Sequence, residues 1–200
     1  MQAITDTKHL TVQTLPPILV LTGEDVGQFE WLKKDILKKI GYDPSDLNYS
    51  YFDMKEASYA EVELDLVSLP FFADEKIVIL DHLLDLTTAK KRYLTDEDLK
   101  QFENYLENPS ESTRLVIIAE GKLDSKRRLV KLLKRDAQII EAATPKEQEV
   151  KRYFASQAQE LGLQFVGDSL DQLLLKSGYD FGELQKNLAL LQAYKEDGQI

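Results

Sequence analysis

Between residues 18 and 141, short apolar runs alternate with segments of helical periodicity, and this alternation constrains the fold more than any other feature. The runs at residues 18–22, 76–80 and 114–119 have the length of strands and are apolar almost throughout, which is typical of strands covered on both faces. The segments between them carry apolar residues three or four positions apart, as helices with one buried face do. Alternating strands and helices favour a parallel sheet with helices on both faces. We therefore predict an α/β fold.

Turn and capping residues set the ends of the predicted elements. Gly41 ends one helix, and Thr95, which is followed by three acids, caps the start of another. The predicted strands are residues 18–22, 47–53, 76–80, 114–119 and 138–141. The predicted helices in the same part of the chain are residues 26–40, 58–67, 95–107 and 125–135.

The pattern changes near residue 143, where strands give way to helices alone. Thr144, Asp168 and Asp180 are the expected N-caps of three helices. These helices are predicted at residues 146–161, 169–176 and 181–194. We therefore expect two domains, an α/β domain over residues 1–142 and a three-helix domain over residues 143–200.

The composition excludes several classes of protein. The chain has no cysteine, so it has neither a disulfide framework nor a thiolate metal site, which suits a reducing compartment. Residues 1–14 are polar and mixed, unlike a signal peptide, and no apolar run is long enough to cross a membrane. We expect a cytoplasmic protein. The formal net charge of −10 makes the chain a poor DNA binder by itself, because phosphate neutralisation dominates such affinity.

The turn after the first predicted strand lies where an α/β domain would carry a phosphate-binding loop. Such a loop needs glycines at a set spacing, followed by Lys and Ser or Thr. Here Gly23 and Gly27 are one residue too close together, and no Lys-Ser or Lys-Thr follows. The carboxylates of Glu24 and Asp25 would also repel a triphosphate. We predict no cofactor; a divergent nucleotide-binding ATPase or kinase is the alternative.

The third predicted strand ends in Asp81 and His82. Four apolar residues followed by an acid resemble the strand that presents a magnesium-binding carboxylate in nucleotide hydrolases, although a histidine replaces the glutamate that would polarise water. We favour the simpler interpretation, in which the acid at the strand end faces solvent. His9 is the only other histidine, so we predict neither a histidine-based metal site nor a catalytic residue.

Two adjacent phenylalanines, Phe71 and Phe72, follow Pro70 between a predicted helix and a predicted strand. Because proline disfavours helical geometry in the residue before it, the helix should end near Val67. Successive side chains on an irregular segment tend to point apart, so one ring at least could face solvent and bind another protein. On these residues alone, the alternative that both rings cap the local core stays open.

Basic residues are densest between residues 122 and 135. Arg127, Lys131 and Arg135 fall on one face of the predicted helix, opposite its leucines. Together with Lys126 they form either a solvated outer face or a contact surface for an acidic partner or a DNA backbone. A DNA-contacting scaffold is therefore a further hypothesis.

Four segments together resemble the delta subunit of the bacterial DNA polymerase III clamp loader. They read PILVLTGED at residues 17–25, SLPFFADEKIVIL at 68–80, LVIIAEGKLD at 115–124, and DFGEL at 180–184 with Asn187 and Leu188 after it. The resemblance covers essentially all 200 residues, and the paired phenylalanines are its most specific part. It implies an AAA+-like parallel sheet with flanking helices that has lost its phosphate loop, followed by a small three-helix lid domain. The family's C-terminal collar domain is absent here, so we expect an N-terminal fragment.

The resemblance also implies a role in DNA replication. The family's delta subunit binds the beta sliding clamp and opens it for loading onto DNA, as part of the DNA polymerase III holoenzyme and without hydrolysing ATP itself. Its partners are the clamp and the other clamp-loader subunits, which join through the collar domain. DNA is expected as a partner only within that complex, and no membrane contact is expected.

The family's clamp-binding element maps onto Val67, Ser68, Leu69, Pro70, Phe71 and Phe72. The resemblance implies that Phe71 and Phe72 take the two deepest positions and that Leu69 is an accessory anchor. The sequence departs from the family at Val67, where related motifs often carry glutamine. This departure would weaken one polar contact.

Overall fold

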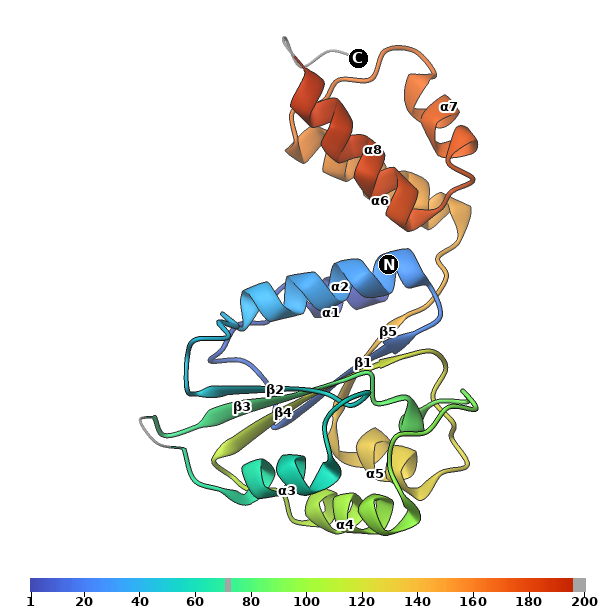
Figure 1. The fold of residues 1–200 in the computed structure, drawn as a ribbon. Coiled ribbons are helices and arrows are strands. Elements are labelled where there is room, and N and C mark those ends of the chain that lie inside the picture. The colour runs from blue at the N-terminus through green and yellow to red at the C-terminus, as the bar shows by residue number, and fades with distance from the viewer. Residues whose placement is uncertain (71–72, 196–200) are drawn as a thin grey trace.

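The computed structural model describes residues 1–70 and 73–195 of the chain (Figure 1). Its centre is a sheet of five parallel strands in the order β2-β3-β4-β1-β5. The strands are β1 (Ile18–Gly23), β2 (Tyr49–Asp53), β3 (Lys76–Asp81), β4 (Thr113–Glu120) and β5 (Gln138–Ala142). The parallel α/β sheet predicted from the alternating pattern is thereby confirmed.

Helices cover both faces of this sheet. The helices of the described residues are α1 (Gln2–Asp6), α2 (Val26–Lys39), α3 (Tyr59–Val67), the 3-10 turn η1 (Leu84–Leu86), α4 (Asp96–Glu107), α5 (Arg128–Asp136), α6 (Glu147–Glu160), α7 (Ser169–Lys176) and α8 (Phe181–Tyr194). Helices α1 and α2 lie on one face, and α3, α4 and α5 lie on the other (Figure 1). Among the described residues, none of these helices is both long enough and apolar enough to cross a membrane.

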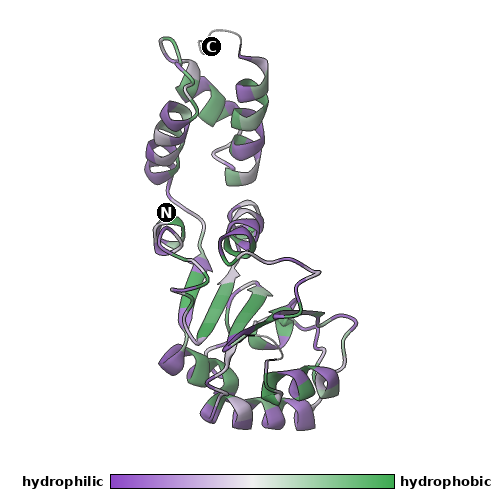
Figure 2. Cartoon of the chain, turned by 90° about the vertical axis from the view of Figure 1, so that its left-hand side faces the viewer, coloured by the Kyte–Doolittle hydropathy of each residue, from purple (hydrophilic) through white to green (hydrophobic). Residues whose placement is uncertain are grey.

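Successive side chains of each strand pack on opposite faces of the sheet. In β1, Leu19 and Leu21 join the apolar cluster that includes α2, whereas Ile18 and Val20 join the cluster under α3, α4 and α5. Both β1 and β3 are buried at every position, which explains their largely continuous apolar sequences. Figure 2 shows these hydrophobic strands between helices that carry hydrophilic residues.

The three C-terminal helices lie beyond α2 and away from the strands of the sheet, with α8 packed on α2 (Figure 1). Phe154 of α6 and Phe181 of α8 belong to the same apolar cluster as Leu32 of α2. The Phe181 ring also lies edge-on to Trp31 of α2, with 6.1 Å between ring centroids. A continuous apolar contact therefore joins α2 to the helices above it.

Several element boundaries differ from those predicted. Neither α1 nor η1 is predicted from the sequence, since helices of 5 and 3 residues are too short to show a helical period. Helix α5 begins at Arg128 rather than at residue 125, because Arg127 has an extended backbone with φ −72° and ψ 140°. The prediction that Thr144 caps α6 is wrong. That helix starts after Lys146, whose amide donates to Glu149 Oε2 at 3.0 Å.

The two other predicted caps have different outcomes. The carboxylate of Asp180 accepts the amide of Glu183 at 2.8 Å, so this N-cap of α8 is confirmed. Asp168 precedes α7 but its side chain accepts no helix amide. Instead, its Oδ2 accepts from Gln172 Nε2 at 3.0 Å, a contact one turn along the helix.

Candidate protein-binding site

The turn between β1 and α2 is packed tightly against other backbone segments. Gly23 has φ +133°, and a Cβ built there would lie 2.3 Å from the carbonyl oxygen of Ala142. A Cβ on Gly27 would lie 2.5 Å from the amide nitrogen of Gly182, at the start of α8. Only glycine permits such close approach. The two glycines that resemble part of a phosphate loop thus pack this turn against β5 and α8.

A carboxylate of the chain itself caps the N-terminus of α2. Asp25 Oδ1 accepts the amide of Gln28 at 2.8 Å, and the Asp25 amide donates to the Ala142 carbonyl at 3.1 Å. A free helix N-terminus attracts phosphate through its unpaired amides and its dipole. Because an acidic side chain already lies at this N-terminus, the geometry disfavours a second anion there.

Asp81, at the end of β3, is buried, so the prediction that it faces solvent is wrong. Its Oδ2 accepts from Lys33 Nζ of α2 at 2.6 Å and from the hydroxyl of Tyr51 in β2. His82 Nδ1 lies 3.3 Å from the same oxygen and 3.0 Å from Asp53 Oδ1. The cause is the position of α2, whose Lys33 side chain reaches across to the end of β3.

The contacts of Asp81 compete with the binding of a metal ion. The Lys33 ammonium pairs with the carboxylate oxygen that a magnesium ion would need. Within the part of the chain that the structure describes, no group of three or more His, Cys, Asp or Glu side chains is arranged to hold a metal. Burial raises the pKa of Tyr51, and its hydrogen bond to Asp81 raises it further. This cluster is therefore suited to join β2, β3 and α2.

Helix α3 exposes apolar side chains near its C-terminus. Leu64 is 71% exposed, Val67 is 59% exposed and Leu69, just after the helix, is 76% exposed. Val62 and Leu66, on the other face of the helix, are buried in the apolar cluster that includes residues of the sheet. The helix ends at Val67, as predicted. Exposed apolar residues this close in sequence are typical of a protein-binding surface.

Four of the six residues predicted to bind a partner lie among the described residues. Val67, Ser68 and Leu69 are exposed, and Pro70 is half-buried. Phe71 and Phe72 lie outside the described residues. The exposure of their rings therefore stays a prediction.

Two sets of ionic contacts anchor the residues on either side of these phenylalanines. Lys76 Nζ donates to Ser68 Oγ at 2.7 Å, and to both the carboxylate (3.1 Å) and the carbonyl oxygen of Asp65. Arg114 of β4 pairs with Glu75 through two bonds, Nε to Oε2 at 2.9 Å and Nη2 to Oε1 at 2.5 Å. The hydrogen bond from Arg114 holds the pKa of Glu75 below its usual value. Both ends of the segment are thus attached to the sheet.

The basic residues near α5 do not form the single face that the sequence predicts. Arg127 precedes the helix, and its guanidinium pairs with Asp124 Oδ2 at 3.1 Å and donates to the carbonyl of Asp85 in η1. Arg135 is exposed but pairs with Asp136 at 2.7 Å. Lys126 and Lys131 are exposed. The predicted face therefore loses Arg127, and Asp136 offsets the charge of Arg135.

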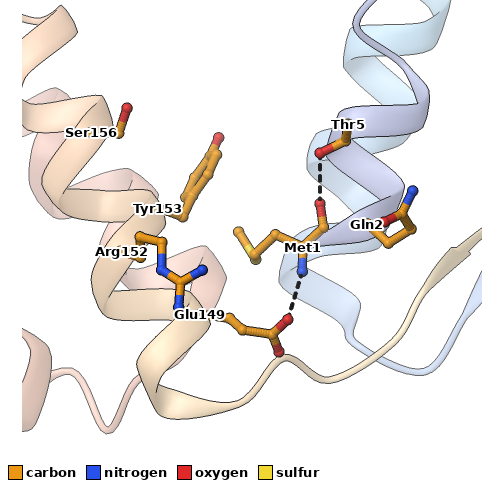
Figure 3. A pocket seen from close by; sticks show the side chains of 7 residues that line it. All are labelled: Met1, Gln2, Thr5, Glu149, Arg152, Tyr153 and Ser156. Carbon is orange, nitrogen blue, oxygen red and sulfur yellow. Dashed lines mark hydrogen bonds and ion pairs between the residues drawn. The ribbon is translucent and has the colours of Figure 1, made fainter.

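A cavity of about 430 Å³ lies between α1 and α6 (Figure 3). Glu149 of α6 accepts from the Met1 ammonium at 3.4 Å, and Arg152 and Tyr153 extend from the same helix. This cavity could not be predicted from the sequence, because α1 is too short to show a helical period. The ammonium of Met1 and the carboxylate of Glu149 neutralise each other, and the guanidinium of Arg152 adds a positive charge to the lining.

A family model described as DNA polymerase III, delta subunit, matches residues 19–143. This chain belongs to the DNA polymerase III delta subunit family. The matched delta-subunit region runs from β1 to just past β5 and includes the exposed apolar segment after α3. Helices α6, α7 and α8 lie beyond it.

Two delta proteins from Bacillus subtilis are similar to this chain, one in sequence and one in structure. A DNA polymerase III subunit delta from Bacillus subtilis (strain 168) is 27% identical over 137 residues, which make up 68% of this chain and 40% of that relative. A solved DNA clamp loader delta protein from Bacillus subtilis matches with a TM-score of 0.73 and 22% identity, over 100% of this chain and 59% of the other. The structural likeness shows the fold. The chain spans less than two thirds of the length of either relative.

The delta-subunit resemblance found in the sequence is thereby confirmed. Segments 68–80 and 115–124 lie within the region that the family model matches, whereas residues 180–184 lie after it. The family match covers residues 19–143 and assigns no role to Val67, Leu69 or the basic residues near α5. The clamp-binding element therefore remains a proposal.

Proposed function

We propose that this delta family member is a non-catalytic clamp-loader subunit that binds the beta sliding clamp and opens it for loading onto DNA. Its binding element is the segment Val67, Ser68, Leu69, Pro70, Phe71 and Phe72. The observation that carries the proposal is the exposure of Val67 and Leu69 beside a segment whose two ends are anchored by Lys76 and Arg114.

The free energy of apolar burial supports this role. Burying one leucine or phenylalanine side chain in a partner's pocket contributes about 1.5–3 kcal/mol. Two phenylalanine rings together with Leu69 would then supply most of the affinity of a modest interface. Anchored ends reduce the conformational entropy that the segment loses on binding, which raises the affinity further.

Opening the clamp requires more than binding to it. A protein shifts an equilibrium between two forms of its partner only by the difference in its affinity for them. The element must therefore bind the open form of a clamp interface more tightly than the closed form. ATP bound by partner subunits, and not by this chain, would control when the element is presented.

The proposal that this subunit does not hydrolyse ATP is supported by Asp25 and Asp81. Asp25 lies at the helix N-terminus where a phosphate would bind, and Lys33 pairs with Asp81 where magnesium would bind. Phosphoryl transfer depends on positioning both phosphates and metal at such sites. Charges of the chain itself occupy the two positions.

We also propose the wider organisation of the subunit. Residues 1–142 form an AAA+-like domain and residues 143–200 form a lid domain, and the other clamp-loader subunits join through a collar domain present in longer family members. DNA is contacted only within the complex, in the cytoplasm. Lys126 and Lys131 are the exposed candidates for that contact, while Arg127 and Arg135 are paired with acids.

Retention on an immobilised sliding clamp from the same organism tests the proposal. The 200-residue chain should be retained on the clamp, and the variant Phe71→Ala/Phe72→Ala should not be retained. The matched control Leu175→Ala/Leu190→Ala removes two exposed apolar side chains of α7 and α8 and should be retained. Equal retention of all three proteins would contradict the proposed element.

A further inference from the structure

Lys76, the first residue of β3, is a buried lysine whose ammonium has three acceptors. Its side chain is 6% exposed. The ammonium donates to Ser68 Oγ at 2.7 Å, to Asp65 Oδ1 at 3.1 Å and to the Asp65 carbonyl oxygen. A lysine ammonium has three N–H donors. Every donor of this buried cation therefore has an acceptor in or just after the last turn of α3.

Removing an ammonium group from water is costly unless it is paired and hydrogen-bonded. The last carbonyls of a helix have no partner within the helix, and a cation near them interacts favourably with the helix dipole. Lys76 supplies that cation for Asp65, and Thr113 Oγ1 donates to the next carbonyl, that of Leu66, at 3.2 Å. The end of α3 is thus attached to both β3 and β4.

The residues that Lys76 contacts alternate with exposed apolar residues. Asp65 lies next to Leu64, and Ser68 lies between Val67 and Leu69. Leu64 is outside the clamp-binding element predicted from the sequence, yet it is 71% exposed, three residues before Val67. Contacts that fix Asp65 and Ser68 therefore also fix where these three apolar side chains lie.

The ion pair of Glu75 with Arg114 cannot by itself fix the positions of these apolar side chains. Both of its side chains are partly exposed, and exposed pairs contribute little to the ordering of a structure. The Lys76 side chain is itself buried, at 6% exposed, and its part-buried contacts bond the helix end directly.

We propose that Lys76 is a positioning residue for clamp binding. Through Ser68 and Asp65 it holds the apolar surface formed by Leu64, Val67 and Leu69 in the arrangement that the clamp recognises. This inference rests on the proposed function. It adds Leu64 to the surface that contacts the clamp. It also proposes that one buried lysine keeps the side chains of that surface in a fixed arrangement.

Clamp binding by matched variants of the 200-residue chain tests this inference. Lys76→Met keeps the length of the side chain and removes its three bonds, and Kd should rise about tenfold, the effect of one charged hydrogen bond. Ser68→Ala should raise Kd less, and Lys76→Met/Ser68→Ala should be no weaker than Lys76→Met alone, because the two residues act through one contact. Lys38→Met, at an exposed position of α2, is the control and should bind like the unmodified chain.

Amide hydrogen exchange separates positioning from general stability. In Lys76→Met, exchange at Val67, Ser68 and Leu69 should accelerate while the strands of the sheet keep their protection. An unchanged Kd and unchanged exchange in Lys76→Met would overturn the inference. If that variant binds normally while Leu69→Ala binds weakly, the inference fails and the proposed function stands. If the unmodified chain does not bind the clamp, both fail.

Discussion

Gly27 and Gly182 meet backbone to backbone, so that a Cβ built on Gly27 would lie 2.5 Å from the amide nitrogen of Gly182 and 2.8 Å from its Cα. One glycine lies in the first turn of α2 and the other in the first turn of α8. Alanine would favour helix formation at both positions. The contact explains why glycine is present instead, and it places α8 over the N-terminal turn of α2.

Gly27→Ala should therefore destabilise the protein although alanine is the better helix former. The added methyl group would push α8 away from α2, and overpacking of this kind costs about 1–3 kcal/mol. Gly182→Ala is the matched control, because its Cβ would lie 3.2 Å from the nearest atom of Gly27. Its free energy of unfolding should fall less than that of Gly27→Ala. Urea unfolding measures both free energies. Equal stability of Gly27→Ala and the unmodified protein would contradict the contact.

Asp81→Asn should lower the free energy of unfolding strongly. The substitution leaves the Lys33 ammonium, which is 2.6 Å from Asp81 Oδ2, without its counter-charge. Breaking a buried pair in this way costs about 3–5 kcal/mol, and partial exposure of Lys33 places the expected loss at the lower end. Asp136→Asn, which breaks the exposed pair with Arg135, should cost less than about 1 kcal/mol. Similar losses in the two variants would argue against a buried cluster.

Stability should fall at high pH because buried tyrosines must ionise on unfolding. Burial raises the pKa of Tyr153 to about 12 and also raises the pKa values of Tyr51 and Tyr59. Above the ordinary tyrosine pKa of about 10, the unfolded chain loses protons that the folded chain keeps. Their contribution to stability is therefore complete below about pH 10 and decreases as the pH rises further.

Tyr59→Phe tests that pH dependence at one position. The Tyr59 hydroxyl is buried without a hydrogen-bond partner among the described residues, so its removal should leave stability near pH 7 unchanged or slightly higher. The same variant should lose less stability than the unmodified protein between about pH 7 and about pH 11. Urea unfolding at both pH values gives the comparison. An identical loss of stability in the two proteins would show that Tyr59 does not contribute to the pH dependence.

Magnesium and ATP together should not bind this chain at micromolar concentrations. Asp25 repels phosphate at the α2 N-terminus, and Gly182 packs against Gly27 directly behind it. Titration calorimetry should show no saturable heat, and Asp25→Ala should not restore binding because α8 still covers the turn. Binding with a Kd of about 1 μM, equivalent to about 8 kcal/mol, would instead favour the ATPase or kinase alternative.

The sheet could be predicted from sequence because its pattern is local. Each of β1, β3 and β4 lies under helices on both faces, so a run such as Leu19 to Leu21 is apolar without interruption. The end of α3 could be predicted for a similar reason, since the backbone restriction that Pro70 imposes acts on its immediate neighbour.

Contacts between distant residues account for what the sequence did not reveal. Asp81 is buried because Lys33, 48 residues away, reaches it from α2. Arg127 leaves the predicted basic face because it donates to the Asp85 carbonyl, 42 residues away. Neither contact leaves a signal in a single sequence, because either cation could have met many other carboxylate or carbonyl acceptors. The periodicity of the sequence does not single out Leu69, whereas the family resemblance does.

Calorimetric titration of the beta sliding clamp with the 200-residue chain tests the central claim most directly. The clamp should bind the unmodified chain, and Phe71→Ala/Phe72→Ala should weaken binding by more than about tenfold, or about 1.4 kcal/mol. Leu175→Ala/Leu190→Ala should leave Kd within about twofold, since those residues lie outside the proposed surface. A Kd for the double phenylalanine variant within about tenfold of the unmodified value would contradict the account.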